Sequence, residues 1–331
     1  MKVAVAILNY NGATLLPRFL PSVVEHSKEA EVWVIDNGST DNSLAWLTTH
    51  FPDVRQIRLE KNLGYCTGYN DGLKQIDADV YVLLNSDVEV TAGWLTGPIA
   101  LLKNDLTIAA VQPKLLSYQN RHQFEYAGAG GGFLDSLCYP YCRGRIFDRL
   151  ENDHGQYNDS CEVMWVSGAC LFVRAAVFHE HGGFEPTFFA HMEEIDLCWR
   201  IRRSGKKIFY CGASTVYHLG GGTLPVSSPR KTYLNFRNNL SLMIRNLTAR
   251  SLVWILPVRF GLDGIAALKF LLEGHGASAV AVVKAWWNFG INLKTELHKR
   301  ESTQRLPFGW SRSLGGMRLL IWERWGKRVS F

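Results

Sequence analysis

The segment Val34-Ile35-Asp36-Asn37-Gly38-Ser39-Thr40-Asp41 decides the fold, because a short apolar run ends there in a polar turn. The run predicts a buried strand over residues 32–35, and the turn predicts the start of a helix over residues 41–49. The same alternation surrounds it, with predicted strands at 3–8, 54–59 and 80–84 and predicted helices at 14–27, capped by Thr14, and at 68–75. Short strand–helix connections predict an α/β fold with a largely parallel sheet.

Each predicted strand of this region ends in polar residues. The clusters are Asn9-Tyr10-Asn11, residues 36–41, Asn62-Leu63-Gly64-Tyr65 and Asn85-Ser86-Asp87. Ligands of parallel sheets bind beyond the carboxyl ends of the strands, so we expect these clusters to face one ligand. Asp36 could accept hydrogen bonds from a nucleobase or ribose, and Asp87 could hold Mg²⁺ or Mn²⁺ together with phosphate oxygens. The alternative is structural: Ser39 or Asp41 caps a helix, and Asp87 ends a turn.

Further along the chain, the sequence predicts strands at 108–113, 164–173, 208–211 and 215–217 and a helix at 193–203. That helix begins with Glu193, Glu194 and Asp196, and a partly buried acid there is a candidate general base. The alternative is that these acids complement the helix dipole and that Asp196 pairs with Arg200. His218 ends a predicted strand, where it could complete a cation site with Asp87, although a lone histidine is more often structural.

Several classes of protein are excluded by missing patterns. A dinucleotide-binding fold would need G-x-G-x-x-G where Asn9-Tyr10-Asn11-Gly12 stands, and no Walker A pattern is present. The seven cysteines form no regular framework, which favours a reducing, cytoplasmic compartment. Cys138, Cys142, His154 and Cys161 match no standard zinc spacing, so we interpret them as unpaired groups in a loop region.

The charge is divided between an acidic body and a basic tail. Residues 230–331 hold 17 Lys and Arg against 5 Asp and Glu, whereas residues 1–229 hold 19 against 25. A protein that binds nucleic acid through overall basicity is therefore excluded. The tail predicts helices that carry Trp254, Trp286, Trp287, Trp310, Trp322 and Trp325. Two interpretations stay open for them: contact with an anionic membrane surface, or packing on the body with solvated Lys and Arg.

The clusters, taken in order, resemble the family 2 glycosyltransferases of the GT-A fold, and in particular their rhamnosyltransferase-like bacterial branch. The resemblance spans about residues 2–240. It rests on Asn9-Tyr10-Asn11-Gly12, on residues 34–41 and 62–72, on Asn85-Ser86-Asp87 as an Asp-x-Asp variant, and on Glu193-Glu194-Ile195-Asp196-Leu197. It implies a Rossmann-like, mostly parallel central sheet flanked by helices.

The resemblance also implies roles for individual residues. Asp87 and His218 would bind the divalent cation, Mn²⁺ or Mg²⁺. Glu194 would be the catalytic base, with Glu193 and Asp196 as alternatives because Glu replaces the usual Asp. The residues implied in binding the nucleotide-sugar are Leu8, Tyr10, Asp36, Asn62, Gly64, Asn70, Asn85, Ser86 and Arg237.

From this we expect a GT-A catalytic domain over residues 1–229, with a nucleotide-binding half over about 1–110 and an acceptor half over about 111–229. A basic, Trp-rich helical extension would cover residues 230–331. The implied activity is inverting transfer from a UDP-, dTDP- or GDP-sugar to a glycan or lipid-linked acceptor of the cell envelope. The enzyme would be cytoplasmic, with peripheral contact to the inner face of the membrane, and self-association stays open. The alternatives are a non-catalytic nucleotide-sugar-binding scaffold of the same fold and a sugar-nucleotide pyrophosphorylase.

Overall fold

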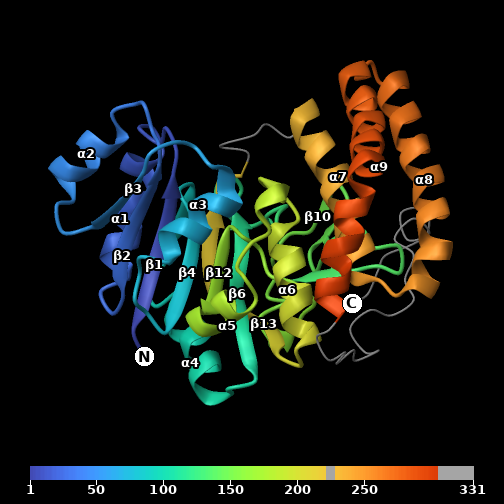
Figure 1. Ribbon diagram of the computed structural model, residues 1–331. Coiled ribbons are helices and arrows are strands. Elements are labelled where there is room, and N and C mark those ends of the chain that lie inside the picture. Colours follow the sequence, from blue (N-terminus) through green and yellow to red (C-terminus); the bar gives the residue numbers. More distant parts are fainter. Residues whose placement is uncertain (221–227, 305–331) are drawn as a thin grey trace.

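The computed structural model describes residues 1–220 and 228–304, and its centre is a sheet with helices on both faces (Figure 1). The strands of this sheet are β1 (Val3–Asn9), β2 (Glu31–Asn37), β3 (Arg55–Leu59), β4 (Val80–Asn85), β5 (Val88–Val90), β6 (Ile108–Ser117), β11 (Ser160–Glu162), β12 (Cys170–Arg174) and β13 (Lys207–His218). The helices are α1 (Leu16–His26), α2 (Ser43–His50), α3 (Gly64–Leu73), α4 (Thr96–Asn104), α5 (Ala175–Glu180), α6 (Glu193–Arg203), α7 (Pro229–Asn246), α8 (Ala249–Leu272) and α9 (Gly276–Gln304), with a 3-10 turn η1 at Pro186–Phe188.

The strand order is β11-β13-β6-β12-β4-β1-β2-β3, and β5 pairs with β13. Strands β1, β2, β3 and β4 are parallel to their neighbours, as are β6 and β13, while β12 runs against β4 and β6 between them. The predicted α/β fold with a mostly parallel sheet is confirmed. A small antiparallel sheet lies in the middle of the chain, made of β7 (Gly132–Leu134), β8 (Pro140–Cys142), β9 (Arg145–Ile146) and β10 (Arg149–Leu150).

Alternating side chains of the central strands fill two apolar cores, one on each face of the sheet. In β1, Ala4 and Ala6 point into the core beneath α3, whereas Val3, Val5 and Ile7 point into the other core. All five are almost completely buried. A strand with both faces buried must be apolar throughout, which explains the continuous apolar run at the start of the chain.

Three sequence-based predictions for these elements were wrong in detail. Residues 164–169 leave the predicted strand 164–173, since Ser167 donates its N–H to Gln112 Oε1 (2.8 Å) and only Cys170–Arg174 joins the ladder. The predicted strands 208–211 and 215–217 are one strand, β13, with a register shift between Cys211 and Thr215. Thr14 does not cap α1, whose first turn is instead held by the Gly12 carbonyl.

Three helices, α7, α8 and α9, form a layer at the α6 side of the molecule (Figure 1). Helix α7 contacts α6 and α9, and α9 also contacts α8. The predicted helical extension is thus seen as far as residue 304; its later part, with Trp310, Trp322 and Trp325, lies outside the described residues.

Within the described residues, no helix has the length and apolar character needed to cross a bilayer.

Candidate active site

The carboxyl ends of β1, β2 and β4 meet at one edge of the sheet, as predicted. Strand pairing sets Asn9 beside Asp36 and Leu8 beside Asn85. Polar groups that are far apart in sequence therefore line one edge. We call this region the carboxyl edge.

Asp36 is buried at the carboxyl edge and holds the turn that follows β2. Its Oδ1 accepts a hydrogen bond from Asn9 Nδ2 (3.0 Å), and its Oδ2 accepts one from the Ser39 N–H (3.1 Å). Gly38 in this turn has φ +73°, and a Cβ there would lie 2.5 Å from the backbone of Lys61. Both oxygens of Asp36 are thus used to fix the turn, while Asp41 accepts the N–H groups of Ser43 (3.0 Å) and Ala13 (2.9 Å).

The next strand connection is tied to the same edge by two amides. Asn37 donates to Asn62 Oδ1 (3.2 Å) and to the Gly64 carbonyl (3.1 Å) and accepts from the Leu63 N–H (3.0 Å). Gly64 has φ +78°, and a Cβ there would lie 2.6 Å from the ring of Phe189. These contacts start α3 at residue 64, earlier than the predicted residue 68, because its first amides bond the Phe189 carbonyl.

Asp87 and His218 point at one another across β4 and β13. Asp87 Oδ1 lies 3.1 Å from His218 Nε2, and Asn85 Nδ2 lies 3.4 Å from the same nitrogen. The pairing of β13 with β5, which sets His218 beside Val88, brings these residues together. Burial disfavours the charged imidazole, but the carboxylates of Glu125 and Asp87 raise the pKa of His218 to about 10.

Glu125 is a buried residue of this site that sequence reasoning missed. Its Oε1 lies 3.3 Å from His218 Nδ1, on the side of the ring opposite Asp87. A carboxylate at Nδ1 favours a proton on that nitrogen, so a cation that displaces the Nε2 proton would find Nε2 as the ligand atom. Glu125 stands in an irregular segment, Phe124-Glu125-Tyr126, that carries no motif and no periodicity, so nothing in the sequence marks it.

The pair Asp87–His218 fits a divalent cation that takes its other ligands from a substrate. Two ligands at right angles around an octahedral ion, each about 2.1 Å away, are about 3.0 Å apart. The separation of 3.1 Å between Asp87 Oδ1 and His218 Nε2 matches that spacing. Over residues 1–220 and 228–304, no cluster of three or more His, Cys, Asp or Glu side chains forms a complete metal cage. Phosphate oxygens and water would have to complete the coordination.

The loop before α6 is strained. Phe189, His191 and Met192 all have positive φ (65°, 70° and 72°), a conformation that bulky residues rarely adopt. Its carbonyls are held from two sides. Asn238 donates to the carbonyls of Phe188 (3.1 Å), Ala190 (3.0 Å) and His191 (2.7 Å), and the Tyr65 N–H donates to Phe189 (3.0 Å).

This strained loop places two acids at the start of α6. Glu193 is buried and Glu194 is half-buried, and one carboxylate oxygen of each has no hydrogen-bond partner among the described residues. Burial raises the pKa of Glu194 to about 7. Burial, and then the charge of Glu194, raises the pKa of Glu193 well above its usual range. A carboxyl group that titrates near neutral pH has the properties of a general base.

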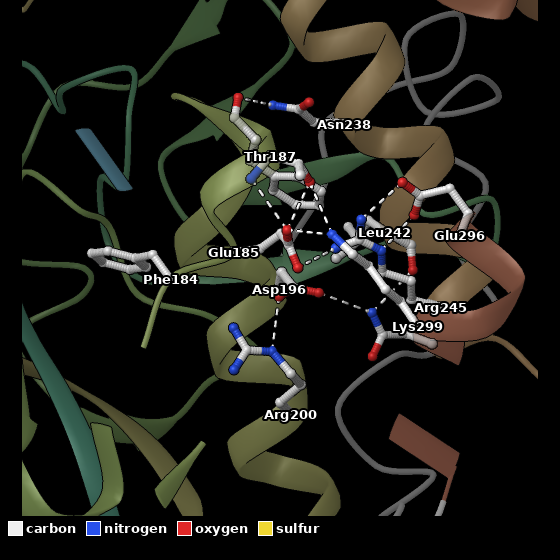
Figure 2. A network of polar contacts seen from close by, with 12 residues as sticks. Phe184, Glu185, Thr187, Asp196, Arg200, Asn238, Leu242, Arg245, Glu296 and Lys299 are labelled. Carbon is white, nitrogen blue, oxygen red and sulfur yellow. Dashed lines mark hydrogen bonds and ion pairs between the residues drawn. The ribbon is translucent and has the colours of Figure 1, made fainter. Parts of the chain in front are cut away.

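Asp196 takes part in a network of polar side chains beside α6 (Figure 2). It accepts from Arg200 Nε (2.8 Å) and from Asn246 Nδ2 (3.4 Å), in accordance with the structural alternative for this residue. Beside it, Arg245 bonds Glu185 (3.0 Å) and Glu296 (2.5 and 2.9 Å). This network, which also includes Lys299, joins the loop before α6 to α7 and α9.

Two of the residues implied in binding the nucleotide-sugar use their polar groups for hydrogen bonds to the backbone of residues 184–188, just before the strained loop. Arg237 donates to the carbonyls of Thr187 (2.8 Å) and Phe188 (3.1 Å). Asn70 bonds both backbone groups of Phe184, at 2.7 and 2.9 Å. Their visible contacts therefore position the loop that leads to α6.

The remaining implied residues lie along the carboxyl edge. Tyr10 is 42% exposed, Leu8 and Ser86 are half-buried, and Asn62 is exposed. None of these side chains is buried away from solvent, so a ligand at the edge could reach them.

Electrostatic interactions connect the surroundings of the cation pair with those of the acid pair. Burial raises the pKa of the Cys142 thiol, and the negative charges of Glu125 and Glu194 raise it further. Lys231, near the start of α7, likewise interacts with Glu125 and with His191 of the strained loop. Glu125, beside His218, and Glu194, at the start of α6, therefore both lie within electrostatic reach of Cys142.

Comparisons with known proteins agree with this architecture. The family model of glycosyl transferase family 2 matches residues 4–182. N-acetylglucosaminyl-diphospho-decaprenol L-rhamnosyltransferase from Mycobacterium tuberculosis is 26% identical over 231 residues, which cover 65% of this chain and 75% of the relative.

Two solved structures share the fold. GalNAc-T7 with UDP, GalNAc and Mn²⁺ superposes with a TM-score of 0.56 at 18% identity, over 74% of this chain and 48% of its own. The mannosyltransferase PcManGT from Pyrobaculum calidifontis, in complex with GDP-Man and Mn²⁺, has a TM-score of 0.52 at 15% identity, over 92% of this chain and 85% of its own. The match of more than half the chain to the family model, on a sheet whose carboxyl edge gathers the expected side chains, places this protein in glycosyl transferase family 2, as a glycosyltransferase of the GT-A fold.

Proposed function

We propose that the protein is an inverting, cation-assisted glycosyltransferase that uses a nucleoside-diphosphate sugar. The observation that carries the proposal is the approach of His218 Nε2 to within 3.1 Å of Asp87 Oδ1 at the carboxyl edge. An imidazole and a carboxylate at that spacing suit a Mn²⁺ or Mg²⁺ ion whose other ligands are diphosphate oxygens. The solved relatives that share the fold were crystallised with Mn²⁺ and either UDP or GDP-Man.

The donor would lie along the carboxyl edge. Asp36 fixes the turn against which the nucleoside packs, and Leu8, Tyr10 and Asn62 offer surfaces that are not covered by other side chains. Asn85 and Ser86 precede the cation ligand Asp87 and would contact the ribose and diphosphate. Gly64, Asn70 and Arg237 would act by positioning the strained loop against this ligand.

In the proposed reaction, Glu194 accepts the proton of an acceptor hydroxyl. The hydroxyl oxygen forms a bond to the anomeric carbon from the face opposite the leaving group. The bond between that carbon and the diphosphate oxygen breaks, and its electron pair leaves with the nucleoside diphosphate. A divalent cation held by Asp87 and His218 would supply positive charge to this leaving group. Burial would keep the pKa of Glu194 high, and Asp196 would anchor α6 through Arg200.

We further propose a lipid-linked or other cell-envelope glycan as acceptor, met at the inner face of the cytoplasmic membrane. The relative from Mycobacterium tuberculosis, by its name, transfers rhamnose to a diphospho-decaprenol-linked sugar. The proposal extends that acceptor class, and no particular sugar, to this chain.

The experiment is a screen of UDP-, dTDP- and GDP-sugars with the purified full chain, with and without Mn²⁺. Binding is read by thermal shift and reaction by release of the nucleoside diphosphate. We expect one base to stabilise the protein only when the cation is present, and slow hydrolysis of its sugar without an acceptor. A chain that binds a nucleotide-sugar but never releases nucleoside diphosphate would be the non-catalytic scaffold instead.

A further inference from the structure

Along residues 251–268, helix α8 exposes apolar side chains and buries its charged ones. Over residues 251–268, all of which the structure describes, the exposed side chains carry no charge. The two charged residues of this stretch, Arg259 and Asp263, point inward: their side chains are 3% and 1% exposed, and they face each other at 3.6 Å. A helix whose outer face meets water shows the opposite pattern.

The inward charges are held by the protein. Arg259 donates to the Leu137 carbonyl (2.7 Å) and lies over the ring of Tyr139, and Asp263 accepts from Trp286 Nε1 (3.1 Å). These contacts fix the rotation of α8 about its axis. The apolar residues therefore face outward because of specific contacts, and the helix cannot turn them inward without breaking the contacts of Arg259 with Leu137 and Tyr139 and of Asp263 with Trp286.

The exposed face continues onto α9. Of the eighteen exposed large hydrophobic residues in the described chain, fourteen lie on α8 and α9. They are Val253, Trp254, Val258, Phe260, Ile265, Leu268, Leu271, Leu272, Val280, Val283, Trp287, Ile291, Leu293 and Leu297. We call these residues the α8–α9 face. Exposed apolar side chains gathered on two helices in contact mark a binding surface rather than ordinary protein surface.

The positive charge around the α8–α9 face indicates what binds there. The exposed lysines Lys269, Lys284 and Lys294 stand on the same two helices, Lys269 paired with the exposed Glu273 at 3.5 Å, and the chain from residue 230 onward carries 17 basic against 5 acidic residues. A second copy of the chain seated on this face would bring like charges together, which disfavours association. An anionic bilayer offers acyl chains to the apolar side chains and phosphate groups to the lysines, with tryptophan at the boundary.

The position of the face matches this occupant. The turn between α8 and α9, with the exposed Leu271 and Leu272, lies at the same end of the molecule as the carboxyl edge of the sheet and the start of α7 (Figure 1). A surface that meets the end of the hairpin would also lie near the candidate active site.

We propose that the α8–α9 face is a lipid-binding surface that seats the protein on an anionic bilayer. The consequence that an acceptor anchored in the same bilayer reaches the carboxyl edge rests on the proposed function; the bilayer contact does not.

The test uses the full chain and flotation with vesicles of phosphatidylcholine alone or mixed with phosphatidylglycerol. The variant carries Trp254→Asp and Ile265→Asp, at two positions 74% and 64% exposed. The matched control is Leu106→Asp, which is 73% exposed on the body of the protein. Thermal unfolding shows that each variant folds, and donor hydrolysis in the absence of vesicles reports separately on the active site.

We expect the wild-type chain and Leu106→Asp to float with the mixed vesicles and more weakly with phosphatidylcholine alone. The double variant should bind at least about tenfold less, because two large apolar contacts are replaced by charges. Wild-type chain that does not float, or a double variant that floats as well as wild type, would overturn the proposal. A wild-type dimer that the double variant makes monomeric, with no flotation, would identify a second copy as occupant and would also overturn it. Loss of hydrolysis with flotation intact would count against the proposed function alone.

Discussion

The carboxyl edge and the start of α6 differ in how far their buried polar groups are hydrogen-bonded. At the carboxyl edge, Asp36 has partners for both carboxylate oxygens, and Asn37 is bonded through both ends of its amide. At the start of α6, Glu193 and Glu194 each have a buried oxygen without a partner, behind a loop with three strained residues.

The difference separates the residues that shape the site from those that perform its chemistry. A satisfied buried carboxylate keeps its charge and stabilises the fold, whereas an unsatisfied one has a raised pKa and is ready to accept a proton. Burying two carboxyl groups without partners lowers the stability of the fold. Contacts elsewhere, such as those of Asn238 with the strained loop, offset this loss.

The largest expected effect belongs to the acid pair. Replacing Glu194 by Gln removes the proton acceptor but keeps the shape, so kcat should fall by about a thousandfold or more while donor binding is retained. Glu193→Gln is the matched control and should retain activity within about tenfold. Steady-state kinetics with a soluble acceptor decide between them, and the reverse ranking would assign the base to Glu193.

The network behind α6 should have the next largest effect. Arg245→Met leaves the buried carboxylates of Glu185 and Glu296 without their shared cation and should lower the free energy of unfolding by about 3–5 kcal/mol. Lys74→Met, which breaks the exposed pair with Asp71, should cost less than about 1 kcal/mol. Urea unfolding measures both. Equal effects would mean that the network does not hold α7 and α9 to the catalytic loop.

At the carboxyl edge we expect a loss of stability. Asp36→Ala removes the acceptor for the Asn9 amide and the Ser39 N–H, and should cost about 1–3 kcal/mol. Glu194→Gln, by contrast, removes a charge from a buried site and should leave stability unchanged or raised. If Asp36→Ala and Glu194→Gln lower the free energy of unfolding by similar amounts, the proposed difference between the carboxyl edge and the start of α6 is wrong.

A variant of Glu125 tests whether this carboxylate orients the imidazole of His218. Glu125→Gln should weaken binding of Mn²⁺ with nucleoside diphosphate by about 10–100-fold, as measured by calorimetry, because Nδ1 of His218 loses its carboxylate. Glu89→Gln, at a half-buried acid paired with Arg121, is the control and should bind normally. Unchanged affinity in Glu125→Gln would remove Glu125 from the site.

The smallest effect is a shift in pH dependence. Glu194 acts as a carboxylate, and its pKa is raised to about 7, so kcat/KM should fall as pH drops below about 7 and level off above it. Glu193→Gln should leave this limb near the same pH, because burial and not the charge of Glu193 raises the pKa of Glu194. A profile that is flat between pH 5 and 8 (roughly the range around that pKa) would contradict the raised pKa.

The sequence was sufficient for the elements that depend on local pattern. Continuous apolar runs identified β1, β2 and β4, and the polar residues after them were correctly expected at one edge, because parallel strands end together. Helix α6 was predicted with its observed bounds, since its apolar period and acidic first turn are both local signals.

Contacts between segments far apart in the chain could not be predicted from local sequence patterns. Glu125 meets His218 across an irregular segment, and α3 begins at Gly64 because of a carbonyl at Phe189. Residues 164–169 leave the ladder for a side chain of β6. The inverted polarity of α8 was also missed, because only the packing of Arg259 and Asp263 shows which face of the helix is inside.

The most direct test of the account is the position of Mn²⁺ in crystals of the chain grown with the nucleoside diphosphate that stabilises it. Anomalous diffraction should place the ion within about 2.1–2.3 Å of both Asp87 Oδ1 and His218 Nε2, with the remaining ligands from diphosphate and water. An ion bound to the diphosphate but out of reach of either side chain would contradict the central claim that β4 and β13 together hold the cation.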